Sequence, residues 1–200
     1  AAPFDDVYRT IFALSGIGMF QSTPAGYYLK ANPALAGILG YPSADSLIDE
    51  VEDIAREFYV EPGRRTAFMQ ALDVEDRISG FVSRIRRRDG RMIWVSETAT
   101  AVRDAAGGLC YYIGTLEDIT DRIHAEEALQ SALRSYRDLF TNASEGIYRT
   151  SPAGRLLRAN PALVKMMGYD SETALIGAID EIGGEIYVDP RRRTDFMREI

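Results

Sequence analysis

The side chains that most often carry out catalysis are scarce in this chain and lie in different segments. The 200 residues include one cysteine, Cys110, and one histidine, His124. A nucleophilic Cys–His pair is not expected, because Cys110 falls on a predicted strand, as a small buried residue, and His124 on a predicted helix. A single cysteine also excludes an internal disulfide and a metal site built from several thiolates. The sequence therefore predicts no catalytic residue and no metal site.

The sequence also lacks the motifs of common enzyme families. The sequence contains no serine-hydrolase, zinc-protease or P-loop motif, and Gly16-Ile17-Gly18 lacks the rest of a dinucleotide fingerprint. Acid–base chemistry by carboxylates alone stays open, although no motif points to it. We therefore do not expect this chain itself to be an enzyme.

One acidic residue, Glu97, occupies a position where a charge is costly. Along Arg91–Ala101 the side chains alternate between two faces of a predicted strand, and Glu97 shares its face with Val95 and Ala99. A carboxylate among apolar side chains is destabilising unless it is paired. We predict that Glu97 is buried and hydrogen-bonded, to Arg87 or a helix residue in preference to a polar or cationic ligand; a gap open to solvent is the alternative.

The elements that would position Glu97 follow from the periodicity of the sequence. The predicted elements are a helix at Phe4–Leu14, strands at Ile17–Ser22 and Tyr27–Ala31, a helix begun by Asn32-Pro33 and ended by Gly40, short helical segments after Ser43 and Asp53, a helix from Glu61 to Leu72, and strands at Ile78–Arg88, Arg91–Arg103 and Leu109–Glu117. Asp89-Gly90 is typical of a hairpin turn. This order predicts an α+β domain with one antiparallel sheet.

Much of this pattern occurs twice. Tyr8–Leu72 aligns without a gap with Tyr136–Ile200, an offset of 128 residues (136 minus 8), and Glu57–Met69 closely matches Glu185–Met197. Solenoid repeats are about 20–50 residues long, so this offset indicates whole domains. The second copy lacks any counterpart of Asp73–Asp118, which carries the three later strands.

A predicted helix starting at Thr120 connects the two copies. Leu129, Leu133, Tyr136 and Phe140 are spaced four, three and four residues apart, which is the seam of a heptad repeat. A continuous helix is stiff, so it can transmit a rotation or a change of register from one domain to the other.

Several short motifs, in this order, resemble those of PAS domains from bacterial sensory proteins. They are Ala31–Leu35 (ANPAL), Leu39–Tyr41 (LGY), Tyr59–Pro62 (YVEP), Arg88–Gly90 (RDG), Trp94-Val95, Gly114 and Glu117–Thr120 (EDIT). The resemblance implies a five-stranded antiparallel sheet of order 2-1-5-4-3 with short helices on one face. It also implies a PAS domain at residues 1–119, a signalling helix at 120–140, and the first half of a second PAS domain at 136–200.

PAS domains bind ligands between the sheet and the helices, and strand alternation shows which side chains face that space. The expected lining residues are Phe68, Met69, Phe81, Ile85, Val95, Glu97, Ala99, Tyr112 and Leu116. An ordinary packed core is the favoured alternative for the apolar members of this set. The cofactor is unknown. By the resemblance, haem and covalently bound flavin are not expected, because His124 lies beyond the domain and Cys110 lies on the last strand rather than in the central helices. A non-covalently bound flavin or an atypical haem ligand stays open.

The resemblance also implies a relay and a dimer. Asp118 and Thr120 match the signature that ends a PAS domain and starts the signalling helix, so they are the expected relay residues. A homodimer is expected, with Trp94 on the outer sheet face and Leu129 and Leu133 on the helix as contacts.

Composition limits the partners. A net charge of −7 argues against nucleic acid as a partner, and no apolar run reaches the ~18 residues of a membrane span.

We expect a cytoplasmic sensory region of a bacterial signalling protein that senses a small ligand. Its output enzyme, a histidine kinase of a two-component system or a diguanylate or other nucleotide cyclase, would lie outside this chain. The alternative is a ligand-free dimerisation or protein-docking module.

Overall fold

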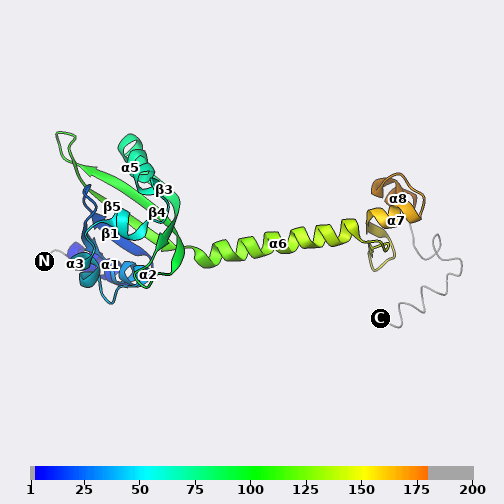
Figure 1. The fold of residues 1–200 in the computed structure, drawn as a ribbon, viewed down its shortest axis with the longest axis horizontal. Coiled ribbons are helices and arrows are strands. Elements are labelled where there is room, and N and C mark those ends of the chain that lie inside the picture. Colours follow the sequence, from blue (N-terminus) through cyan, green and yellow to red (C-terminus); the bar gives the residue numbers. More distant parts are fainter. Residues whose placement is uncertain (1–2, 180–200) are drawn as a thin grey trace. The chain divides into compact units, whose positions relative to one another are not determined.

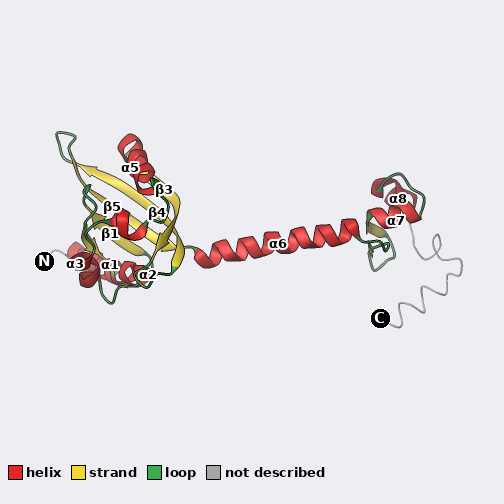
Figure 2. Ribbon diagram, viewed as in Figure 1, coloured by secondary structure: helices red, strands yellow, loops and turns green. Residues whose placement is uncertain are grey.

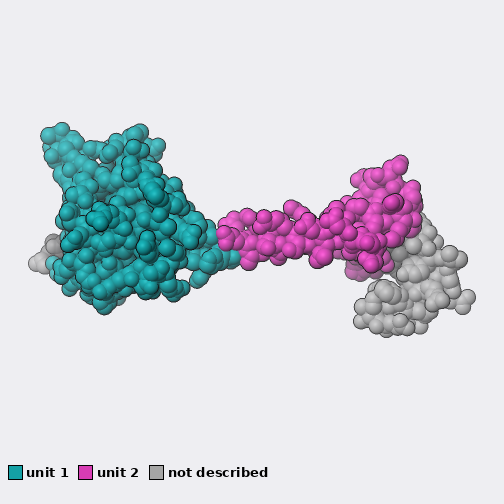
Figure 3. Space-filling model, in the orientation of Figure 1, with its two compact units in different colours: residues 1–125 teal, residues 126–200 magenta. Residues whose placement is uncertain are grey.

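The computed structural model describes residues 3–179 of the 200-residue chain (Figure 1). It divides into two compact units, residues 1–125 and 126–200 (Figure 3). Each unit is described by itself.

The first unit contains all the elements of the domain predicted from the sequence. They are α1 (Pro3–Leu14), β1 (Gly18–Ser22), β2 (Tyr28–Ala31), α2 (Pro33–Leu39), α3 (Ala44–Glu50), α4 (Ile54–Phe58), α5 (Arg64–Glu75), β3 (Arg77–Arg86), β4 (Met92–Arg103), β5 (Leu109–Asp118) and the start of α6 (Thr120–Asn142). The five strands form one antiparallel sheet of order β2-β1-β5-β4-β3, as Figure 2 shows in yellow. The predicted fold and strand order are confirmed.

The core of this unit lies between one face of the sheet and the helices. Alternate residues of the central strands β5 and β4 point into it, among them Tyr112, Leu116 and Val95, and meet Leu35 of α2 and Phe68 of α5. The same alternation carries Glu97 inward between Val95 and Ala99. Strand geometry therefore fixes the position of the charge that the sequence singled out.

Local sequence explains where helix α2 begins and ends. Asn32 caps the helix, because its side-chain oxygen accepts a hydrogen bond from the amide of Leu35 (2.9 Å), and Pro33 occupies the first helical position. Gly40 ends it in the left-handed conformation (φ 85°), which glycine adopts without strain. Both boundaries match the prediction.

Two details of the prediction are wrong. Helix α5 begins at Arg64 instead of Glu61, because Gly63 adopts a left-handed conformation (φ 80°) immediately before it. Cys110 is exposed rather than buried. It lies at the start of β5, directly after the β4–β5 turn, and its first well-buried neighbour on the strand is Tyr112. Strand alternation assigns a face, but it does not say where the covering helices end.

The second unit repeats the beginning of the first. It contains the rest of α6, β6 (Tyr148–Thr150), β7 (Leu156–Ala159), α7 (Pro161–Met166) and α8 (Glu172–Ala178). Asn160 caps α7 as Asn32 caps α2, and a small core forms around Leu156, Val164 and Leu175. The repeated stretch Glu185–Met197 lies outside the described residues.

Candidate functional site

The interior of the first unit contains a buried acid–phenol pair. Glu97 is 4% exposed, and the Tyr59 hydroxyl donates a hydrogen bond to its Oε2 at 2.5 Å. Tyr59 lies between α4 and α5 and is bridged to Ile85 of β3, an edge strand of the sheet. The predicted burial and hydrogen bonding of Glu97 are confirmed, although the partner is Tyr59 and not Arg87.

Burial shifts the protonation equilibria of this pair. It raises the pKa of the Glu97 carboxyl, and the Tyr59 hydrogen bond and the nearby Arg65 charge only partly offset that effect. Burial, together with the adjacent Glu97 charge, raises the pKa of the Tyr59 phenol well above its ordinary value. The same two causes raise the pKa of Tyr28. Tyr59 and Tyr28 therefore stay protonated donors at neutral pH.

A guanidinium group completes the cluster. Arg65 of α5 is 9% exposed, and its guanidinium carbon lies 5.0 Å from the Phe68 ring centroid and 5.8 Å from that of Tyr59. Its charge lowers the pKa of Glu97, which means that it favours the ionised carboxylate. The cluster thus brings a carboxylate, a cation and phenolic hydroxyls together inside an apolar core.

The space beside this cluster is small. A cavity of about 10 Å³ is lined by Tyr28, Leu39, Ile54, Phe58, Tyr59, Ile85, Glu97 and Leu116. A cavity needs roughly 10–15 Å³ to hold one water molecule. The arrangement as it stands has room for a single water-sized guest, and a larger ligand would need the helices to move away from the sheet.

Hydrogen bonds join the central strand to the start of helix α6. The amide of Ile119 donates to the carbonyl of Trp94 (2.8 Å), and the amide of Trp94 donates to Oγ1 of Thr120 (2.9 Å). Thr120 in turn donates its hydroxyl proton to Oδ1 of Asp118 (2.6 Å), which also accepts the Thr120 amide (2.9 Å). Trp94 and Glu97 lie three residues apart on β4. Asp118 and Thr120 therefore attach the first turn of α6 to the strand that carries the buried charge.

With this geometry established, comparison with known proteins assigns the family. The PAS domain family matches residues 16–121, and a second PAS family matches residues 134–199. The chain belongs to the PAS domain family.

Among the described residues, no helix is long and apolar enough to cross a membrane, and no group of three or more His, Cys, Asp or Glu side chains could hold a metal ion.

Individual relatives give more detail. Over 146 residues, or 73% of this chain, the sequence is 27% identical to the biofilm dispersion protein BdlA of Pseudomonas aeruginosa, and it spans about a third (34%) of that protein. The structure is similar to that of an RNA-binding light-oxygen-voltage receptor (TM-score 0.55, 23% identity, 67% of this chain and 38% of that one). It also resembles a PAS domain from Colwellia psychrerythraea (TM-score 0.50, 16% identity, 59% and 98%). The two structures show a shared fold.

The residues predicted to line the PAS pocket occupy three kinds of position. Ile85, Glu97 and Leu116 line the cavity. Phe68, Val95, Ala99 and Tyr112 are buried in the surrounding core, whereas Met69 and Phe81 are half-buried at its border. Sequence reasoning did not assign Tyr59, Tyr28 or Arg65 to the site. Tyr59 was recognised in the YVEP motif, and the need of a buried carboxylate for a donor was the signal that could have pointed to it.

The predicted dimer contacts lie on the surface to different degrees. Trp94 is half-buried on the outer sheet face, next to the partly exposed Met92, while Leu129 and Leu133 of α6 are exposed. Their role in pairing stays a prediction.

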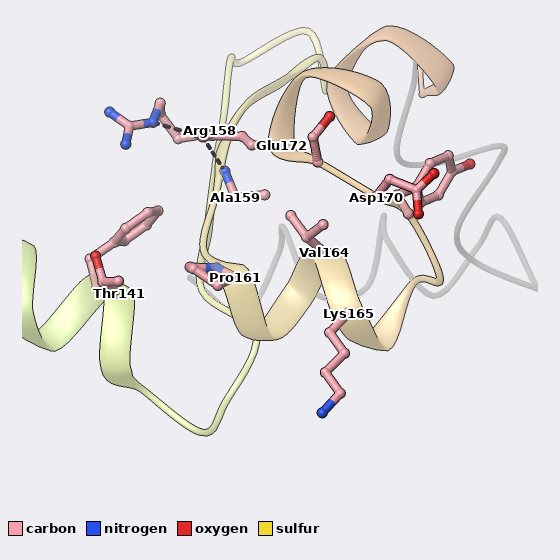
Figure 4. A pocket seen from close by; sticks show the side chains of 11 residues that line it. Thr141, Arg158, Ala159, Pro161, Val164, Lys165, Asp170 and Glu172 are labelled. Atoms are coloured by element: carbon pink, nitrogen blue, oxygen red, sulfur yellow. Dashed lines mark hydrogen bonds and ion pairs between the residues drawn. The ribbon is translucent and has the colours of Figure 1, made fainter.

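The second PAS region has a pocket of its own, of about 580 Å³ (Figure 4). Arg158 lies 5.3 Å from the Phe140 ring centroid and donates to Oε1 of Glu172 at 2.8 Å. The amide of Ala159 also donates to this oxygen (2.9 Å), and these contacts, the amide first, lower the pKa of the Glu172 carboxyl. Of the two cations that line this pocket, Arg158 and Lys165, Arg158 is thus paired within the protein.

Proposed function

We propose that the first PAS domain is the sensory input of a bacterial signalling protein and that it relays its state through helix α6. The observation that carries this proposal is the path from Glu97 along β4 to Trp94, and from Trp94 through Thr120 to the first turn of α6. A change that displaces β4 or β5 by a fraction of an ångström would strain these hydrogen bonds. A switch needs a free-energy difference of only a few kcal/mol between two positions of the helix.

The input would be a small polar ligand or a proton at the Glu97 cluster. The buried hydroxyls of Ser22 and Ser83, which find no hydrogen-bond partner within the described residues, add unused polar groups to the domain interior. Neither serine lines the cavity beside Glu97, so a guest there would pair with them only after the interior rearranged. Such pairing would gain binding energy, because unpaired buried polar groups are costly.

The output would come from a domain outside this chain, a histidine kinase of a two-component system or a nucleotide cyclase, while the chain itself would have no catalytic activity. BdlA is named for biofilm dispersion, and a similar regulatory setting fits this proposal. The free thiol of Cys110 fits a reducing cytoplasm.

Hydrogen exchange tests the relay. Glu97→Gln should change the protection of the amides in the first turns of α6, and Thr120→Val should abolish that effect. Thr120→Ser, which keeps the hydroxyl, is the matched control and should preserve it. If the effect of Glu97→Gln on α6 is the same in the presence of Thr120→Val, the proposed path is wrong.

A ligand-free docking or dimerisation module is the second candidate. The small interior cavity and the exposed Leu129 and Leu133 favour it. Native mass spectrometry of the chain, compared with the denatured chain, separates the two functions. Extra mass that is lost on denaturation supports sensing, whereas an unliganded dimer supports docking.

A further inference from the structure

The first PAS domain has a second hollow, on the side of the sheet that faces away from the core. It lies between helix α1 and the outer face of β1, β5 and β4, and has a volume of about 250 Å³. Its lining consists of Tyr8, Phe12, Met19, Phe20, Gln21, Lys30, Thr98, Ala99, Thr100, Ile113, Gly114 and Thr115. We call this hollow the α1 groove. It is separate from the Glu97 cluster, because Met19 and Ile113 point away from the core.

The position of helix α1 above this groove is fixed by a buried side chain. Asn32 donates from Nδ2 to the carbonyl of Phe12 (3.1 Å) and to that of Ile17 (2.9 Å), and its Oδ1 accepts from the amide of Met19 (2.8 Å). Tyr8 and Phe12 stack on each other at 5.8 Å on α1. The two rings therefore form a preorganised wall of the groove, and a guest would not have to order the wall itself.

The chemistry of the groove is apolar at its base and cationic at its rim. Met19, Ile113 and Phe12 supply apolar surface, and three threonines supply hydroxyls. Lys30 lies at the rim and also lines a neighbouring hollow of about 390 Å³, together with Tyr8, Arg9 and Phe12. Among the side chains that the structure describes, those of residues 6–179, Lys30 forms no ion pair.

Comparison of the two repeats shows that Lys30 lacks the carboxylate partner that its counterpart has. At the same offset of 128, Tyr8, Phe12 and Lys30 correspond to Tyr136, Phe140 and Arg158, and the second ring pair is stacked almost identically, at 5.9 Å. Arg158 is neutralised by Glu172, as Figure 4 shows. The counterpart of Glu172 in the first domain is Ala44, which has no charge. The first domain therefore has the cation and the aromatic pair without the carboxylate that pairs with the cation in the second.

We propose that the α1 groove binds a small amphipathic carboxylate, with its apolar body under Tyr8 and Phe12 and its carboxylate at Lys30. The carboxylate of the ligand pairs with Lys30, as the carboxylate of Glu172 pairs with Arg158 in the second domain. The groove is roughly eight times the ~30 Å³ that a water molecule occupies in the liquid, so the ligand has about eight to ten non-hydrogen atoms. The lining fits the usual pattern of ligand sites, mostly apolar with a few polar groups that fix orientation.

Titration of the complete 200-residue chain with octanoate as the probe ligand tests this proposal. The methyl groups of Met19 and Ile113 are followed by NMR while octanoate is added, and octan-1-ol serves as the uncharged probe of the same length. Octanoate should shift both methyl resonances saturably and bind at least tenfold more tightly than octan-1-ol. Lys30→Gln should remove this difference, whereas Lys165→Gln, at the only other lysine, should leave it unchanged.

Filling the groove provides the second variant. Thr115→Phe places an aromatic ring on the outer sheet face, where it is compatible with a strand, and it should abolish the shift of the Met19 methyl. The proposal is overturned if octanoate leaves both methyl resonances unchanged, or if it binds the Lys30→Gln variant as tightly as the wild type. It is also overturned if the resonances shift on dilution without any probe, because a second copy of the chain then occupies the groove.

Discussion

Tyr59 donates a hydrogen bond to Glu97 across the interior of the first PAS domain. The bond joins the segment between α4 and α5 to the central strand β4, so it connects the helical layer to the sheet. The carboxylate is buried, and this phenol is the hydrogen-bond donor that the described structure gives it. The pair therefore couples the charge of Glu97 to the distance between the two layers.

Removing the phenolic hydroxyl should destabilise the domain. Tyr59→Phe leaves the Glu97 carboxylate buried without its donor, and this should lower the free energy of unfolding by about 1–3 kcal/mol at pH 7. Urea unfolding followed by the fluorescence of Trp94, the single tryptophan, measures the loss. Tyr27→Phe, at an exposed tyrosine of the β1–β2 turn, should change stability by less than about 0.5 kcal/mol. Equal effects of the two variants would contradict the role of the buried bond.

The raised pKa of Glu97 predicts a pH dependence with a definite sign. The folded state binds this proton more tightly than the unfolded state, in which the pKa is about 4.3. The contribution of Glu97 to stability is therefore fully present below the unfolded pKa and is lost as the pH rises through the folded pKa. Glu97→Gln cannot ionise, so its stability relative to the wild type should increase between pH 4 and pH 8.

Unfolding midpoints measured across that pH range test this prediction. Glu117→Gln is the matched control, because Glu117 lies on β5 but is exposed to solvent. It should show no comparable trend. A stability difference between Glu97→Gln and the wild type that stays constant from pH 4 to pH 8 would mean that burial does not raise the pKa of Glu97.

These positions show what the sequence could predict and what it could not. The inward direction of Glu97 follows from the two-residue period of a strand, and the start of α2 follows from an Asn-Pro pair, so both could be predicted. Tyr59 lies in a segment without regular periodicity, and the orientation of its ring depends on the packing of α4 and α5. The exposure of Cys110 depends on where the helical layer ends. Both properties arise from tertiary contacts that no local pattern encodes.

The volume of the cavity beside Glu97 is a further property that the sequence could not predict. The alternation of Val95, Glu97 and Ala99 identifies the residues that face the interior, but it cannot say how closely the opposite helices approach them. Side chains as large as Phe68, Leu35 and Tyr112 fill most of that space. The sequence could therefore predict the lining of the site but not the small size of its cavity.

Asn32 should be essential to the first domain alone. Asn32→Ala removes the cap of α2 and leaves the amide of Met19 and the carbonyl of Ile17 without their partner, at a cost of about 2–4 kcal/mol. Hydrogen exchange should show weaker protection in α1, β1 and α2. Asn160→Ala, the same change in the second repeat, should leave the protection of the first domain unchanged. Loss of protection in the first domain on Asn160→Ala would show that the two units do not fold independently.

The heptad seam on α6 predicts a dimer that two charges should break. Leu129 and Leu133 lie one turn apart and are 61% and 47% exposed, an apolar surface that pairing with a second copy would bury. Leu129→Glu combined with Leu133→Glu would place like charges opposite each other in such a pair. The wild type should sediment as a dimer at micromolar concentration and the double variant as a monomer. Gln130→Glu, one residue off the seam, should remain dimeric, whereas a wild type that is already monomeric would exclude the seam as an interface.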